Sequence, residues 1–164
     1  MSEYRHENLT VLDHKTLLKK LKLSIQLMEL HDENPFKIRS YQSALTSLER
    51  GDQDITALSD SELTHINGVG KGIIEVIQSL KSTETYPLLD QLLEKTPAGV
   101  LEILQIKGLG PKKVKILWEE LGITSTHELM EACQSGKVAQ TKGFGEKTQE
   151  TIIQNLEFKA SNAA

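Results

Sequence analysis

Three short glycine motifs contain the residues best suited to bind an anion. They are Gly68-Val69-Gly70-Lys71, Gly108-Leu109-Gly110-Pro111-Lys112-Lys113 and Gly143-Phe144-Gly145-Glu146-Lys147. Two glycines let a turn take unusual dihedral angles and let its backbone approach a ligand closely. Where a helix begins directly after the turn, its unpaired N–H groups and its dipole favour one phosphate. The motifs therefore indicate phosphate binding.

The sequence around the three motifs repeats as well. Their first glycines lie 40 and 35 residues apart. Apolar residues recur five positions before that glycine and nine positions after it: Leu63, Ile103 and Val138 before, and Ile77, Leu117 and Ile152 after. A repeat of this length is typical of repeated helical units. Each copy is interpreted as a helix, a tight glycine turn and a second helix.

The three copies differ in what they offer a phosphate. In the second, Pro111 suits the first position of a helix, and lysines follow it. In the third, Glu146 stands where an anion would approach, so this copy is expected to be structural. The phosphate-binding residues are therefore predicted in the first two copies: Gly68, Gly70, Lys71, Gly108, Gly110, Lys112 and Lys113. The alternative is that all three turns only connect helices.

Backbone carbonyls in the first two turns are expected to point toward one another. Such a group can hold a monovalent cation, Na⁺ or K⁺, that bridges to the bound phosphate. The predicted carbonyl ligands are Thr64, Ile66 and Val69 in the first turn, and Leu104, Ile106 and Leu109 in the second. No other cofactor is required, because the five histidines lack partners at zinc-site spacing.

The elements that position these turns are all predicted to be helices. Helical periodicity or capping signals predict nine of them. Their expected ranges are 13–30, 35–51, a short helix from Ser59 or Asp60, 71–80, 88–93, 99–104, 111–121, 128–134 and 146–158. The fold class is all-α, in two small helical domains at 1–85 and 86–158. The segment 81–87 is interpreted as a connection and 159–164 as a frayed end.

Composition restricts the kinds of partner. The 164 residues are 38% hydrophobic and 26% charged, with a formal net charge of −4, which argues against coating DNA by bulk charge. No segment is long and apolar enough to span a membrane, and the N-terminus does not resemble a secretory signal. The single Cys133 excludes an internal disulfide and fits the cytoplasm. We expect a monomer.

Four motifs in order resemble a known family. They are Asn34-Pro35-Phe36-Lys37-Ile38-Arg39-Ser40-Tyr41, Ile66-Asn67-Gly68-Val69-Gly70-Lys71, Ile106-Lys107-Gly108-Leu109-Gly110-Pro111-Lys112-Lys113 and Lys142-Gly143-Phe144-Gly145-Glu146-Lys147-Thr148. Together they resemble the N-terminal part of bacterial family X DNA polymerases, relatives of DNA polymerase beta. The resemblance covers roughly residues 13–158. It implies a small lyase-like domain followed by a fingers-like helix-hairpin-helix domain.

The resemblance also implies roles for individual residues. Lys37 and Tyr41 match positions that contact the 5′-phosphate and sugar of DNA in the family. We expect Arg39 to join them in a site for a 5′-phosphate. The lysine that forms a Schiff base in the family's lyases matches Val76, which cannot form an imine, and a further family lysine matches Gly72. The chain stops where the family's palm domain would begin, so the aspartates that hold magnesium for nucleotide transfer are not expected.

The predicted function is a non-catalytic module that binds gapped, nicked or junction DNA in repair without reading its sequence. Two other classes stay open. One is a deoxyribose-phosphate lyase that uses Lys37 or Lys71, and the other is a helical protein-interaction module. An RNA target also stays open, because hairpin amides contact phosphate.

Overall fold

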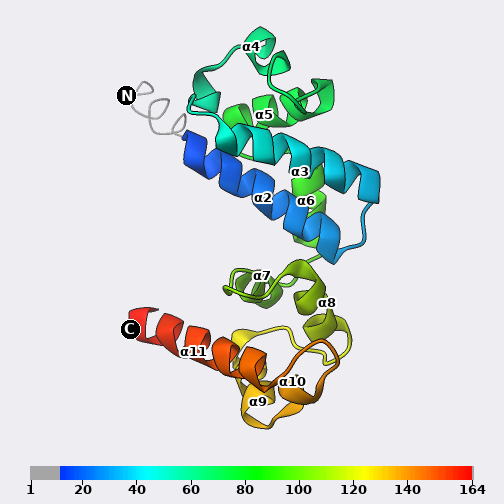
Figure 1. The fold of residues 1–164 in the computed structure, drawn as a ribbon, viewed down its shortest axis with the longest axis vertical. Helices are drawn as coiled ribbons and strands as arrows, with labels where there is room; N and C mark the ends of the chain where they lie inside the picture. The colour runs from blue at the N-terminus through cyan, green and yellow to red at the C-terminus, as the bar shows by residue number, and fades with distance from the viewer. Residues whose placement is uncertain (1–11, 164) are drawn as a thin grey trace. The chain divides into compact units, whose positions relative to one another are not determined.

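The computed structural model describes residues 12–163, and every regular element there is a helix (Figure 1). The all-α fold class is confirmed. Residues 1–11, which the signal-sequence prediction concerns, and residue 164 lie outside the described range. Contacts divide the chain into two compact units between Leu93 and Glu94. None of the described helices has the length and apolar character that a membrane crossing requires.

The first unit contains two long helices and a hairpin of shorter ones. Its elements are α2 (His14–Leu30), α3 (Pro35–Arg50), the 3₁₀ turn η1 (Ile55–Ala57), α4 (Asp60–Thr64), α5 (Lys71–Thr83) and most of α6 (Pro87–Glu94). Helices α2 and α3 run antiparallel and pack side by side (Figure 1). The apolar positions of the repeat lie in the core, where Leu63 and Ile77 are completely buried.

Side-chain caps explain where several of these helices begin. The Asp13 carboxylate accepts from the Thr16 N–H at 2.8 Å, and the Asn34 side chain accepts from Phe36 N–H at 2.8 Å with Pro35 in the first turn. Ser59 forms a capping box with Glu62. The predicted cap at Asn34 is confirmed, and of the two predicted starts for the short helix, Ser59 is its cap.

The second unit contains two further helical hairpins. Its elements are α7 (Ala98–Leu104), α8 (Pro111–Glu119), α9 (Thr126–Gln134), α10 (Lys137–Gln140) and α11 (Glu146–Ala163). Gly122 adopts φ +68° after α8, and its N–H donates to the Trp118 carbonyl at 3.1 Å. Gly122 therefore has the left-handed conformation expected of a glycine after a helix, although α8 ends at Glu119, two residues earlier than predicted, with Glu120 as its C-cap. Cys133 is buried in α9, and burial raises the pKa of its thiol to about 11, as befits a core residue.

The structure corrects three expectations from the sequence. Helix α5 continues to Thr83 and ends at Glu84 with φ +64°, so the connection is shorter than 81–87. The end predicted to fray from residue 159 is helical to Ala163, because no glycine or proline interrupts α11. The four-residue helix α10 was not predicted, since so short an element has no clear periodicity.

Candidate nucleic-acid interface

The three glycine turns share one backbone geometry. The first glycine of each has a positive φ: +86° at Gly68, +91° at Gly108 and +92° at Gly143. In each turn the residue after that glycine donates its N–H to the carbonyl three positions earlier, at 3.1, 3.1 and 3.0 Å. Residues with a Cβ rarely adopt this φ, so glycine is required here for the turn itself. The turns repeat in structure as they do in sequence.

The helices after the first two turns begin without an internal cap. Helices α2, α3, α4 and α9 each begin with a side chain that accepts from a first-turn N–H. By contrast, the N-caps of α5 and α8 are Gly70 and Gly110, and no side chain caps either helix. First-turn N–H groups have no partner within their own helix. Both turns therefore present donors at the positive end of a helix dipole.

The space in front of these donors is open. A Cβ built on Gly70, Gly108 or Gly110 would meet no atom within 4 Å. Gly70 and Gly110 have extended dihedrals that other residues also adopt, so folding does not require glycine at these two positions. Val69 and Leu109, between the glycines, are 5% and 4% exposed and anchor each turn in the core. The space in front of Gly70 and Gly110 is therefore unoccupied by protein atoms within 4 Å of such a Cβ.

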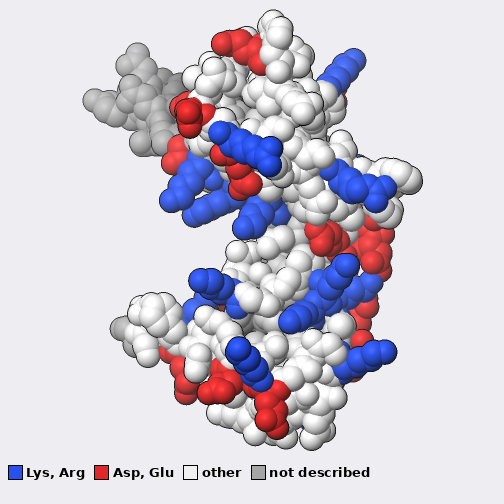
Figure 2. Space-filling model, viewed as in Figure 1, with Lys and Arg blue, Asp and Glu red and all other residues white. Residues whose placement is uncertain are grey.

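Lysines lie beside the open amides. Lys71 and Lys112 are exposed at the starts of α5 and α8, and Lys113 is half-buried. The ammonium of Lys113 lies 5.7 Å from the centre of the Phe144 ring, which belongs to the third turn. In Figure 2, Lys and Arg side chains gather over the α7–α8 part of the second unit. Positive potential therefore accumulates locally although the whole chain is acidic.

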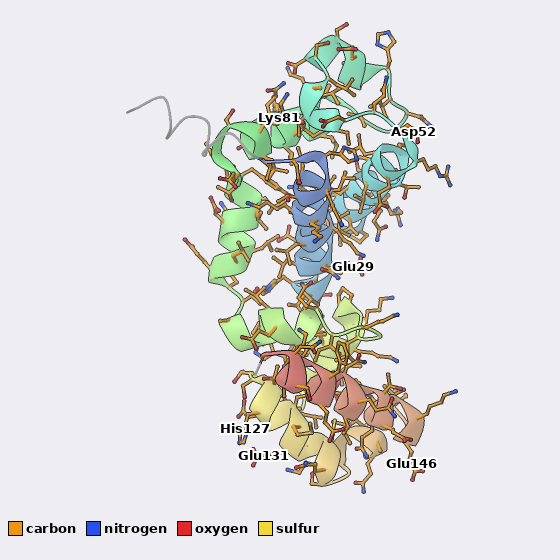
Figure 3. All side chains as sticks on the ribbon, turned by 90° about the vertical axis from the view of Figure 1, so that its left-hand side faces the viewer. Glu29, Asp52, Lys81, His127, Glu131 and Glu146 are labelled. Atoms are coloured by element: carbon orange, nitrogen blue, oxygen red, sulfur yellow. The ribbon has the colours of Figure 1, made fainter. Side chains whose placement is uncertain are left out.

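The third turn supports the second. Glu146 is the first residue of α11, so a carboxylate occupies the end of the helix where a phosphate would otherwise bind (Figure 3). Further along α11, the Asn155 side chain donates to the Lys107 carbonyl at 3.3 Å, directly before Gly108. With the contact between Phe144 and Lys113, this ties α11 to the second turn at two points. The geometry agrees with a structural role for the third copy.

The carbonyls predicted to bind a cation are partly engaged. The carbonyl oxygens of Ile66 and Ile106 accept the turn hydrogen bonds from Val69 and Leu109. Each oxygen has two lone pairs and retains capacity for one more partner. The other four predicted carbonyls are those of Thr64, Val69, Leu104 and Leu109. Among the described residues, no group of His, Cys, Asp or Glu side chains has the arrangement of a metal site.

A hollow of about 420 Å³ lies between α3 and α5. Lys37 and Tyr41 line it from α3, and Gly72 and Val76 line it from α5. Lys37 and Tyr41, expected at the 5′-phosphate, thus line the same hollow as the two positions of the family's lyase lysines. Arg39 and Lys71 do not line it. Burial raises the pKa of Tyr41, so its hydroxyl stays protonated and can donate a hydrogen bond. The lining also includes the carboxylate of Glu75, and it has no lysine at the position of the nucleophile.

Tyr86 is a member of this hollow that sequence reasoning missed. It is 4% exposed, and burial raises the pKa of its phenol. Among the described residues its hydroxyl makes no well-formed hydrogen bond, although the Ser24 and Tyr41 hydroxyls lie close enough to influence that pKa. Tyr86 is far from α3 in the sequence and belongs to no motif, so only the folded chain brings it to the site.

The structure separates Arg39 from Lys37 and Tyr41. Lys37 and Tyr41 are four residues apart and share one face of α3, whereas Arg39 projects from another face. Arg39 lines a second hollow, of about 440 Å³, with Gln42, Ser43, Thr46, Ser47 and Asn67. Its guanidinium lies 4.8 Å from the centre of the exposed Phe36 ring. The predicted 5′-phosphate residues therefore belong to two sites.

Fold and turn geometry define a helix-hairpin-helix protein, and comparison with known families agrees. A helix-hairpin-helix domain matches residues 14–86, and a SAM-like helix-hairpin-helix tandem matches residues 100–157. The first segment ends one residue beyond the expected domain 1–85, and the second lies within the expected domain 86–158.

Comparison with curated proteins adds a particular relative. The chain is 34% identical over 142 residues to the DNA polymerase/3′-5′ exonuclease PolX of Bacillus subtilis (strain 168). The match covers 87% of this chain and 25% of the relative, so the chain corresponds to about a quarter of that protein's length. The resemblance to family X DNA polymerases is thereby confirmed. The domain matches and this relative together support DNA binding by the chain.

Proposed function

We propose that this chain is a non-catalytic module that binds gapped, nicked or junction DNA in repair, largely without reading its sequence. The observation that supports this most is the pair of uncapped helix starts at Gly70 and Gly110, each open to solvent and beside exposed lysine. Such amides contact phosphate, and phosphate contacts position a protein without selecting bases. A monovalent cation on the turn carbonyls would strengthen the phosphate contact.

The number of contacts sets the salt dependence of binding. Two hairpins and the neighbouring lysines correspond to about two to five phosphates, so the affinity should fall with salt by a modest slope. The test measures fluorescence anisotropy with a gapped duplex between low and moderate salt. Lys112→Glu with Lys113→Glu should weaken binding strongly. The proposal would be refuted if the affinity changed neither with salt nor in this double variant.

The hollow beside Lys37 and Tyr41 is proposed as a site for a 5′-phosphate. Its lining includes one cation, Lys37, together with two tyrosines, the start of α5 and one carboxylate, that of Glu75. Its volume is large enough for a phosphate group. A DNA end with a 5′-phosphate should therefore bind more tightly than the same end with a 5′-hydroxyl. Lys37→Gln should remove that difference and leave binding to the hairpins intact.

Lys37 supports a second candidate, a deoxyribose-phosphate lyase, because its side chain lines the hollow that contains Val76. A lyase would form an imine between a lysine amine and the sugar aldehyde. Borohydride reduction on an incised abasic duplex converts such an imine into a stable covalent adduct. An adduct that disappears in Lys37→Gln would establish the lyase, and no adduct is expected for the binding module.

A further inference from the structure

The second hollow on α3, lined by Arg39, Gln42, Ser43, Thr46, Ser47 and Asn67, contains no carboxylate. Its walls come from one face of α3 and from the first glycine turn, since Asn67 directly precedes Gly68. Arg39, Ser43 and Ser47 follow one another at four-residue intervals and span about 12 Å along the helix. This polar strip and the first hairpin thus form one continuous surface.

Close packing holds the turn against this strip. A Cβ built on Gly68 would lie 3.5 Å from the backbone carbonyl of Ser43. The turn therefore sits directly on the middle of α3. Asn67, which lines the hollow, stands three residues before Gly70, the N-cap of α5, so the strip lies beside the first glycine turn.

The side chain of Arg39 is positioned to bind an anion. Its guanidinium stacks on the Phe36 ring, which limits its motion and leaves the N–H edge of the planar group available. Within residues 12–163 no carboxylate pairs with it, and no side-chain hydrogen bond involves Ser43, Ser47 or Asn67. One carboxylate contacts a residue of the lining: Glu29 on α2, labelled in Figure 3, accepts from the Gln42 amide at 3.0 Å. An unpaired, stacked arginine among hydroxyl and amide donors fits a phosphodiester.

We propose that this hollow binds the phosphodiester backbone of the same DNA strand that the first hairpin holds. Arg39 contacts one phosphate, and Ser43, Ser47 and Asn67 donate to it and to its neighbour. The inference rests on the proposed DNA binding and extends it, because it assigns Arg39 to the continuing strand and leaves the 5′-phosphate to Lys37. The first unit then grips DNA at two separate places on α3.

The test uses the full chain and a gapped duplex with one phosphate at a time replaced by a neutral methylphosphonate. Arg39→Gln should lower the affinity about tenfold at low salt. It should also reduce the magnitude of the log–log salt slope by about 0.9, the value for one phosphate on duplex DNA. The variant should become insensitive to one methylphosphonate position. That position should lie within two nucleotides of the one to which Lys71→Gln is insensitive.

Two matched variants make the outcome specific. Arg50→Gln removes an exposed arginine from the same helix outside the hollow and should leave the affinity unchanged. Lys37→Gln should abolish the preference for a 5′-phosphate, whereas Arg39→Gln should retain it. The inference is overturned if Arg39→Gln binds like the wild type, or if it loses the 5′-phosphate preference as Lys37→Gln does. Wild-type protein that binds no DNA would instead refute the proposed function.

Discussion

Replacing Gly110 by serine should change the stability of the fold and the affinity for DNA in opposite directions. Gly110 has φ −83° and ψ 171°, and a Cβ there meets nothing within 4 Å, so serine fits without strain. A serine at the start of a helix accepts from the N–H groups of the first turn. These are the groups proposed to bind phosphate, so the new side chain would satisfy α8 internally and compete with the ligand.

The two effects have opposite signs. Serine should stabilise the fold by about 0.5–1 kcal/mol, because it caps α8 and reduces the freedom of the unfolded chain. DNA affinity should fall by about 1–2 kcal/mol, or roughly five- to thirtyfold, as one charge-assisted contact is lost. Urea denaturation measures the first effect and fluorescence anisotropy with gapped DNA measures the second.

Gly145→Ser is the matched control. Gly145 occupies the same position in the third turn, and a Cβ built on it would meet no atom within 4 Å. Its carbonyl accepts from the Gln149 N–H at 2.9 Å. We expect a similar gain in stability and no change in DNA affinity. If Gly110→Ser gains stability and keeps its full affinity, the second hairpin does not bind phosphate through its amides. Equal losses of affinity in both variants would show that the third turn binds as well.

Three further predictions concern the fold and the 5′-phosphate hollow. Gly99→Ala should destabilise the second unit by about 1–3 kcal/mol in urea denaturation, because its Cβ would lie 1.8 Å from the Thr124 carbonyl oxygen; a neutral effect would contradict this packing. Val76→Lys should place an amine in the hollow and give a borohydride-trapped adduct on an incised abasic duplex, and a folded variant without adduct would show that the pocket does not admit the sugar. Hydrogen bonds with Ser59 lower the pKa of Glu62 in the folded state. The free energy of unfolding that this carboxylate contributes is therefore complete above its unfolded pKa near 4.5 and is lost as the pH falls through the lower folded value. Denaturation at a series of pH values should show that stability declines less steeply with acid in Glu62→Gln than in the wild type.

Local chemistry made the helices and turns predictable. Asn34-Pro35, the capping box at Ser59 and Gly122 act on their own neighbourhoods, so a reader of the sequence can place these boundaries. The glycine turns are local in the same sense, because Gly108 can adopt a φ of +91° only since glycine has no Cβ. Errors arose at the ends of helices and in the four-residue α10, where local preference is weak.

The sequence by itself determined which groups can hold a phosphate, because backbone amides after a glycine turn and the lysines beside them belong to one short segment. Only the tertiary structure decided which distant residues share a site. It brought Tyr86 and Val76 into the hollow of Lys37, and it packed the first glycine turn against the part of α3 that carries Arg39 and Ser43. The physical reason is that packing between helices fixes which faces meet, and that depends on the whole core at once.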